Sequence, residues 1–324
     1  MSFIRTMCGD IAPEALGVTY SHEHLVCRPA FWVERGEDDL ILDDPEKTKQ
    51  DVLLFQAAGG RSIVDATAVD YGRDPGAVRD IAVETGVQIV GTAGFNKSFL
   101  WPAKMPGREC TYENWIEKTS VDDLARFVID EVEHGMNGTD VRAGQVKFGT
   151  GYNSIHPLEI KTIRAVARAH HATGAPIHSH TEAGTMALEQ LQYLREEGVQ
   201  LPNVCFGHMD RNPDPYMHLK LAETGAYLCF DGIAKVKYGP ESVRIACIFE
   251  LFRHGYGDQV LASGDTARKS YYYSYRYGLG LGYILSTWAP RLKEEADAAG
   301  LDGEDVVRRI FVDNPKRCFT FKKG

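Results

Sequence analysis

The amino-acid sequence predicts an α/β fold of the (β/α)8 or TIM barrel type, in which eight parallel strands form a closed cylinder inside a ring of helices. Short apolar segments alternate with amphipathic helical segments along the whole chain. Eight such pairs favour a closed barrel over an open doubly wound sheet. No G-x-G-x-x-G motif follows the first apolar segment, which argues against a dinucleotide-binding fold.

The predicted strands are short runs rich in apolar and β-branched residues. Strands that are apolar throughout are typical of parallel sheets, because other parts of the protein cover both of their faces. The eight segments lie at 18–25, 62–67, 87–94, 144–149, 175–180, 203–208, 226–232 and 258–265.

The segments between these strands have helical patterns with recognisable ends. Asp74 and His156 each precede a proline, a residue that suits the first turn of a helix. Gly86 and Gly174 lie where helices should end, and glycine is common at that position. Helices are expected at 45–58, 75–85, 121–135, 157–173, 184–197, 214–224 and 240–254, with a last group after 276.

The longest segment without a clear pattern is 95–119, which is rich in aromatic residues. Long loops in compact domains often have a functional role. No low-complexity linker divides the chain, so we expect residues 1–324 to form one barrel domain. A length of 324 residues lies within the range of single barrels.

Composition excludes several classes of protein. The chain has a formal net charge of −9, whereas nucleic-acid-binding surfaces are basic. Its 7 cysteines are scattered without a C-x-x-C pair, a pattern typical of reduced thiols. The first residues do not resemble a signal peptide, and no apolar run is long enough to span a bilayer. We therefore expect a cytoplasmic protein that binds neither nucleic acid nor membrane.

Polar side chains with metal-binding chemistry lie at the ends of five predicted strands. In a barrel these carboxyl ends meet at one mouth, where active sites are built. His22 and His24 are two residues apart in a strand and point to the same face, whereas Glu23 points away. Histidine and carboxylate ligands suit zinc and similar divalent ions. The candidate ligands are His22, His24, Lys147, His180, His208 and Asp265.

One strand-end histidine alone is more often a hydrogen-bonded structural residue than a ligand. The metal hypothesis therefore depends on the joint pattern. His178 shares a face with His180, and we expect it to support the ligands or to pack beside them. The remaining histidines fall in helical segments and are expected to be solvated or to cap helices: His134, His170, His171, His218 and His254.

Lys147 ends the fourth predicted strand. A charged lysine is costly to bury, so its ammonium group usually reaches water. Two nearby cations would lower its pKa by like-charge repulsion. A neutral amine can react with carbon dioxide to give a carbamate, whose two oxygens could bridge two metal ions. The alternative is an ordinary lysine that reaches solvent.

Five motifs give the chain its closest resemblance to a known family. They are GVTYSHEHL (17–25), VKFGTG (146–151), IHSHTEAG (177–184), FGHMDRN (206–212) and ASGDTA (262–267). Their order and spacing resemble the phosphotriesterase-related family of the amidohydrolase superfamily over essentially the whole chain. The first motif departs from the family's G-x-T-L-x-H-E-H at Tyr20, which should affect packing rather than metal ligation.

The resemblance implies a metal-dependent hydrolase with two divalent ions. Zn²⁺ is the first choice, and Mn²⁺ or Co²⁺ could replace it. A hydroxide between the ions would attack the substrate, with Asp265 moving the proton to the leaving group. The implied ligands are His22, His24 and Asp265 for the more buried ion, His180 and His208 for the more exposed ion, and carboxylated Lys147 as the bridge.

The segments 230–244 and 263–272 look like those of a phospho-furanose lactonase branch, which hydrolyses sugar 1,4-lactones that carry a 5-phosphate. This likeness implies that Lys237, Arg268 and Tyr271 bind the phosphate. Lys235 and Lys269 add to the same basic cluster, and cations at two adjacent strand ends could clamp an anion. The alternative is a solvated surface cluster. Arg211, just past His208, is a further candidate contact.

The expected partner is thus a small anionic lactone. A related substrate, either an unphosphorylated or acyl-homoserine lactone or an organophosphate triester, is one alternative. Another is a non-catalytic protein that senses a sugar phosphate, which would carry no stoichiometric metal. A homodimer would be ordinary for this fold.

Overall fold

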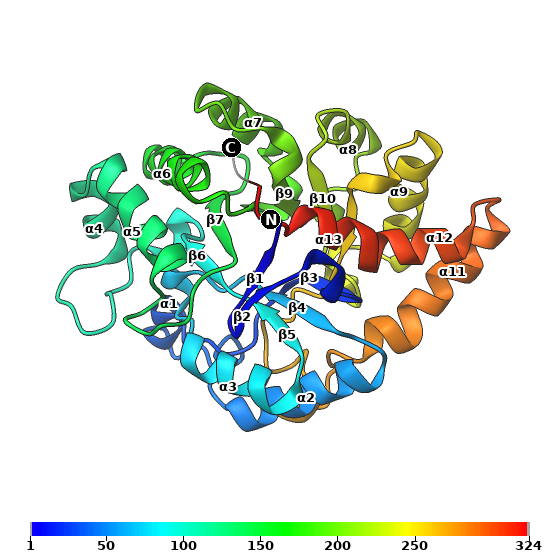
Figure 1. Ribbon diagram of the computed structural model, residues 1–324, viewed down its shortest axis with the longest axis horizontal. Coiled ribbons are helices and arrows are strands. Elements are labelled where there is room, and N and C mark those ends of the chain that lie inside the picture. Colours follow the sequence, from blue (N-terminus) through cyan, green and yellow to red (C-terminus); the bar gives the residue numbers. More distant parts are fainter. Residues whose placement is uncertain (1, 323–324) are drawn as a thin grey trace.

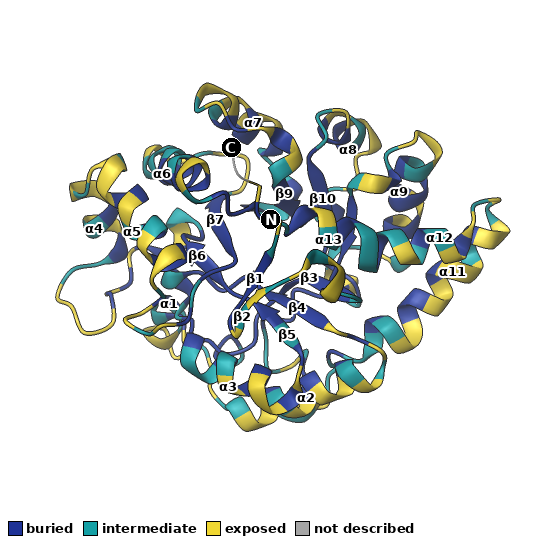
Figure 2. Ribbon diagram, viewed as in Figure 1, coloured by how far each residue is buried: buried dark blue, intermediate teal, exposed yellow. Residues whose placement is uncertain are grey.

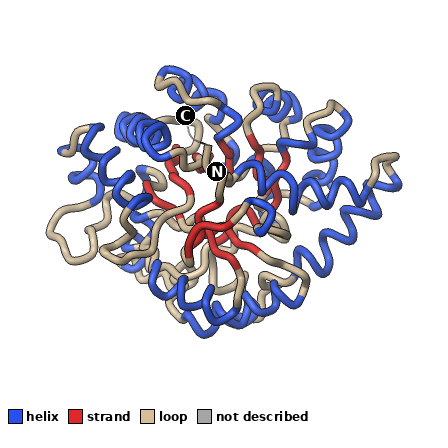
Figure 3. The backbone as a smooth tube through the Cα atoms, viewed as in Figure 1, coloured by secondary structure: helices blue, strands red, loops and turns tan. Residues whose placement is uncertain are grey.

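Parallel strands form a central cylinder with helices around it in the computed structural model, which describes residues 2–322 (Figures 1 and 3). Every strand segment expected from the sequence contains at least one strand. The parallel strands are β3 (Thr19–Glu23), β4 (Ser62–Asp65), β5 (Gln88–Val90), β6 (Thr92–Gly94), β7 (Gln145–Thr150), β8 (Ile177–Thr181), β9 (Val204–Gly207), β10 (Tyr227–Phe230) and β11 (Val260–Ala262).

The strands make eight parallel positions, which we call staves. β3, β4 and β5 pair in that order, and β6 to β11 pair in chain order. β5 and β6 are two halves of the third stave, interrupted at Gly91. The last and first staves are joined where the Asp265 N–H donates to the His22 carbonyl at 3.0 Å. The chain is therefore a (β/α)8 barrel, as the sequence predicts.

The helices between staves begin and end near the expected positions. Asp74 accepts a hydrogen bond from the Ala77 N–H, and His156 forms a capping box with Glu159. Figure 2 shows that the strands are buried and that the helices expose their outer faces. The helices are α1 (Ala30–Val33), α2 (Pro45–Ala57), α3 (Pro75–Thr85), α4 (Tyr112–Lys118), α5 (Val121–Glu133), α6 (Pro157–Thr173), α7 (Ala187–Glu196), α8 (Pro215–Ala222), α9 (Glu241–Arg253), α10 (Tyr273–Arg276), α11 (Ala289–Ala298), α12 (Gly303–Arg308) and α13 (Asn314–Cys318).

Two features differ from the sequence expectation. An antiparallel hairpin, β1 (Ile4–Thr6) and β2 (Gly9–Ile11), precedes the barrel, and Ile4 packs with the inward-facing Val64 and Leu261. Its strands are too short to give a periodic signal. Helix α4 lies inside the segment 95–119 that was expected to be a loop, and Thr111 caps it.

The cysteines and helix lengths agree with the composition. All of the cysteines are free thiols in the structure. Between residues 2 and 322, no helix is both long and apolar enough to cross a membrane.

Candidate metal centre and active site

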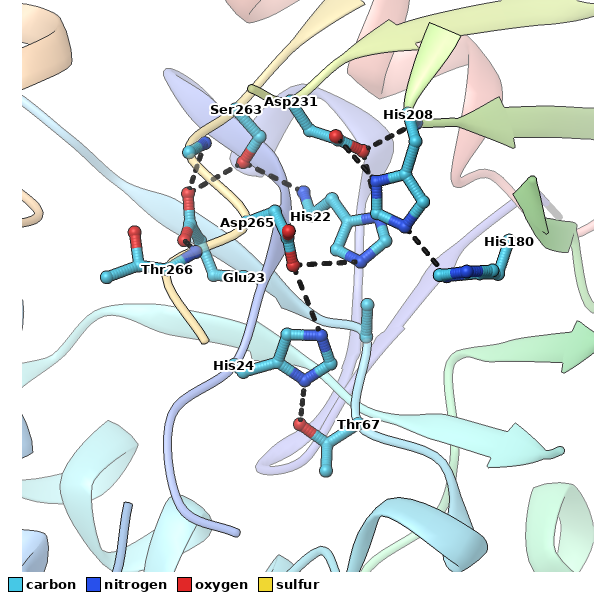
Figure 4. A network of polar contacts seen from close by, with 12 residues as sticks. His22, Glu23, His24, Thr67, His180, His208, Asp231, Ser263, Asp265 and Thr266 are labelled. Atoms are coloured by element: carbon cyan, nitrogen blue, oxygen red, sulfur yellow. Dashed lines mark hydrogen bonds and ion pairs between the residues drawn. The ribbon is translucent and has the colours of Figure 1, made fainter. Parts of the chain in front are cut away.

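Five of the six candidate ligands lie at or just past the carboxyl ends of their staves, and none of the six is more than 8% exposed. Lys147 was expected at a strand end but lies inside β7, because this strand continues to Thr150. Figure 4 shows that the other five point toward one another. Parallel strands make this possible, because their carboxyl ends meet at one mouth of the barrel. The residues are His22 in β3 and His24 just after it, Lys147 in β7, His180 in β8, His208 after β9 and Asp265 after β11.

One group of candidate ligand atoms comes from the first and last staves. Asp265 Oδ1 lies 3.5 Å from His24 Nε2 and 3.8 Å from His22 Nε2. The three residues offer ligand atoms that all lie within 4.8 Å of one another. His22 Nε2 is buried and has no hydrogen-bond partner among the described residues.

A second pair of ring nitrogens faces the same space. His180 Nδ1 lies 2.8 Å from His208 Nε2. Burial lowers the pKa of His208 to about 3 and holds the pKa of His180 well below its ordinary value. Both rings are therefore neutral near pH 7, and their lone pairs are available to a cation.

Lys147 is fully buried in the fourth stave, so its ammonium group does not reach water. Its Nζ donates to the Ala66 carbonyl at 2.7 Å. Burial lowers its pKa to about 8. About a tenth of the amine is thus neutral at pH 7, and the neutral amine is the form that reacts with carbon dioxide.

Three residues fix the orientation of the histidine rings. Asp231 accepts the backbone N–H of His208 at 2.9 Å and lies 2.7 Å from its Nδ1. His178 Nε2 lies 2.9 Å from His22 Nδ1, and Thr67 Oγ1 lies 2.8 Å from His24 Nδ1. His178 therefore has the supporting position expected of it. Asp231 was missed in the sequence, although it directly follows the seventh stave and so could have been found.

Glu23 faces away from the histidine pair, as strand alternation predicts (Figure 4). Its buried carboxylate accepts hydrogen bonds from the backbone N–H groups of Gly264 and Thr266, both at 2.7 Å. These bonds bracket Asp265, whose backbone has a positive φ of 42°. An aspartate with a left-handed backbone conformation needs such support, because few non-glycine residues adopt a positive φ.

Two cationic side chains with little exposure form ion pairs with the carboxylate of Asp265. Arg211 Nη2 and Lys235 Nζ lie 2.5 Å and 2.7 Å from its Oδ2. Burial would raise the pKa of Asp265, but the charges of Lys235 and Arg211 hold it well below its usual range. The carboxylate is therefore ionised at neutral pH.

A cavity of about 530 Å³ opens above these residues. Lys237, Arg268 and Tyr271 line it together with His24, His180, His208 and Asp265. Lys237 Nζ lies 5.6 Å from the centre of the Tyr271 ring. Arg268 Nη1 lies 3.2 Å from Asp39 Oδ2, so the guanidinium is held at the wall by a carboxylate from another loop.

Comparison with known proteins identifies the family. The model of the phosphotriesterase family matches residues 2–319. The chain belongs to the phosphotriesterase family. It is thus a hydrolase, and its family is one of binuclear metal enzymes.

Three members of the phosphotriesterase family illustrate the similarity. A phospho-furanose lactonase from Mycoplasmopsis agalactiae is 32% identical, covering 98% of this chain and 92% of the relative. The structure of a lactonase from Listeria monocytogenes has a TM-score of 0.98 and 62% identity, over 99% of this chain and 100% of that one. The phosphotriesterase homology protein of Escherichia coli, complexed with phosphate in its active site, has a TM-score of 0.86 and 32% identity, over 94% and 99% of the two chains.

The described residues fit the two metal ions of this family. The neutral imidazoles and the ionised Asp265 are ligands that divalent zinc prefers. The partnerless His22 Nε2 gives an independent reason, because a buried nitrogen without a partner is destabilising.

Two of the histidines that were expected to be solvated or to cap helices are buried instead. His170 and His218 are buried rather than solvated. The Nδ1 of His170 lies 2.7 Å from the Ala175 carbonyl, and His218 Nε2 lies 2.9 Å from the Met209 carbonyl. The prediction was wrong for these two because they lie on the inner faces of α6 and α8, where a backbone carbonyl satisfies each ring.

Proposed function

We propose that this enzyme is a lactonase that hydrolyses furanose 1,4-lactones carrying a 5-phosphate. The similarity to lactonases supports the reaction class. The observation that carries the substrate is the basic wall of the cavity, since Lys237 and Arg268 line the same space as His24, His180 and Asp265. A basic wall in a chain of net charge −9 favours an anionic substrate.

The phosphate would lie against Lys237, Arg268 and Tyr271. The guanidinium of Arg268 offers a planar pair of donors that matches two phosphate oxygens, and Lys237 adds a point charge. Tyr271 lies beside both Lys235 and Lys237, with its ring centre 5.1 Å and 5.6 Å from their Nζ atoms. These contacts would hold the lactone ring over the histidine cluster.

Two sets of residues would hold the metal ions, for which zinc is the first choice. His22, His24 and Asp265 would bind one ion, and His180 and His208 the other. The carbamate of Lys147 would bridge them. When bound, such ions supply an activated water and polarise the lactone carbonyl.

Asp265 is the proposed catalytic carboxylate. It would accept the proton of the attacking water and deliver it to the departing ring oxygen. Arg211 and Lys235 keep this carboxylate ionised and fix its orientation. The reaction breaks the carbonyl–ring oxygen bond and yields an open-chain sugar acid that keeps its phosphate.

A second candidate is hydrolysis of an uncharged lactone or phosphotriester. The side chains of Trp32, Leu40 and Phe99 also line the cavity and would suit an apolar substrate. Lys237 and Arg268 in the same cavity would then have no partner in the substrate, so we rank this reaction second.

The test is a panel of pentose 1,4-lactones with and without a 5-phosphate, hydrolysed by the metal-loaded enzyme. Charge-assisted hydrogen bonds contribute about 1.5–3 kcal/mol each, so two of them, from Lys237 and Arg268, should make kcat/KM roughly 10²-fold or more higher with the phosphate. Equal values for both forms of each lactone would contradict the proposal.

A further inference from the structure

A second polar group lies across the cavity from the proposed phosphate site. Lys97 follows β6 in the third stave, and Glu182 follows β8 in the fifth. Lys237 and Arg268 follow the seventh and eighth staves, β10 and β11. In a ring of eight staves, the third lies opposite the seventh. All four side chains line the same cavity, so Lys97 faces Lys237 across it, with Glu182 beside Lys97.

Lys97 and Glu182 form an ion pair that leaves hydrogen-bonding capacity unused. Lys97 Nζ contacts Glu182 Oε2, and His180 Nε2 lies 2.9 Å from the same oxygen. Glu182 Oε1 has no hydrogen bond within residues 2–322. An ammonium group has three donors, and that of Lys97 donates to one protein acceptor. The side chains are only 17% and 31% exposed, so bulk solvent does not surround the pair.

The backbone on both sides of Lys97 is fixed by buried carboxylates. The Asn96 N–H lies 2.9 Å from both oxygens of Asp70. Ser98 donates its N–H and its hydroxyl to Glu159 Oε1 at 2.9 Å and 2.7 Å. The loop therefore presents Lys97 from a rigid base, as a binding residue requires.

We propose that Lys97 and Glu182 form a subsite for the ring hydroxyl groups of the substrate, on the opposite side of the cavity from its phosphate. The inference rests on the proposed lactonase function. A carboxylate oxygen accepts a hydroxyl proton, and an ammonium donates to a hydroxyl oxygen. Two adjacent hydroxyl groups on a furanose ring offer both partners at once. The subsite thus selects polyhydroxylated lactones over deoxy ones.

Lys97 gives the cleaner test, because Glu182 contacts the proposed ligand His180. Lys97→Met keeps the length of the side chain and removes its donors. Lys104 provides a matched control in the following segment, since it is exposed and pairs with Glu109 at 3.4 Å. Lys97→Leu, which also removes the donors, takes the place of the methionine variant if that variant does not fold.

The experiment compares kcat/KM for a pentose 1,4-lactone 5-phosphate and its 2,3-dideoxy analogue. We expect Lys97→Met to lose roughly tenfold or more on the hydroxylated substrate and little on the analogue, whereas Lys104→Met leaves both unchanged. Equal losses on both substrates would overturn the subsite. So would a loss of the preference for phosphate, since Lys97 would then belong to the phosphate site.

The wild-type enzyme separates a failure of the proposed function from a failure of the subsite. A wild-type enzyme that hydrolyses phosphorylated and unphosphorylated lactones equally well would refute the phosphate substrate. The same hydroxylated and deoxy pair without phosphate would still report on Lys97. Retention of the hydroxyl preference in Lys97→Met would then count against the subsite alone.

Discussion

Asp231 contacts His208 through both of its carboxylate oxygens, one at the backbone N–H and the other at ring Nδ1. The contact holds Nε2 of His208 toward His180, 2.8 Å away. It also supports the left-handed backbone of His208, which has a φ of 65°.

The Asp231→Asn variant should therefore bind metal more weakly. Residues that orient metal ligands typically change metal affinity by about 10- to 100-fold when mutated. Competition with a chelator, followed by metal analysis, measures the loss. Asp214→Asn, at an exposed helix cap, is the control and should keep its metal. Unchanged affinity in Asp231→Asn would show that the contact does not orient a ligand.

Replacing Lys147 with alanine should abolish hydrolysis, because the variant lacks the group that would carry the bridging carbamate. The side chain is fully buried, so alanine leaves a void. Acetate or propionate can enter such a void and supply two oxygens, and we expect them to restore part of the activity. Lys147→Met fills the void and should not respond to added acid. A crystal structure with both metal ions bound and an unmodified lysine would refute the carbamate.

Arg268→Ala should reduce kcat/KM for a 5-phosphorylated lactone by roughly 10- to 150-fold, the effect of one lost charge-assisted contact of about 1.5–3 kcal/mol. The kcat/KM for an unphosphorylated lactone should fall little in the same variant. Arg253→Ala is the control, because this exposed arginine pairs with Glu250 and does not line the cavity. The contact between Arg268 and the phosphate would be rejected if kcat/KM fell to the same extent for both substrates.

Asp265→Asn should reduce turnover by a factor of at least about 10²–10⁴, since an amide cannot accept and return the proton. The amide nitrogen and oxygen retain the shape of the side chain, and Glu23 continues to fix the surrounding backbone. The substitution removes the charge that pairs with the buried Arg211 and Lys235, so we expect a lower thermal unfolding temperature while circular dichroism still reports a folded barrel. Near-normal turnover would eliminate the proton-transfer role.

The sequence predicts the barrel well because its signals are local and repeated. Each stave is an apolar run, and helices such as α3 and α6 have a proline at the start and a glycine at the end. The convergence of the proposed ligands follows from the same pattern, since the strands of a barrel end at one mouth. The β1–β2 hairpin carries no comparable signal, because three-residue strands are too short to show a period.

Pairings between distant residues could not be predicted in this way. The contact between Lys97 and Glu182 depends on the geometry of two loops, and the charges give no indication of the partner. The burial of His170 and His218 was not predicted either. Their helices reveal which face is apolar, but the carbonyl that satisfies each ring lies outside the helix, at Ala175 and Met209.

The hydrogen bond from Asp265 to His22 unites the first and last staves at the point where the proposed ligands lie. A growing polypeptide cannot complete that ligand set until nearly all of it has left the ribosome. Binding of metal by the full proposed ligand set would therefore follow the joining of these two staves, and a truncation that removes residues 260–265 would leave the set without Asp265.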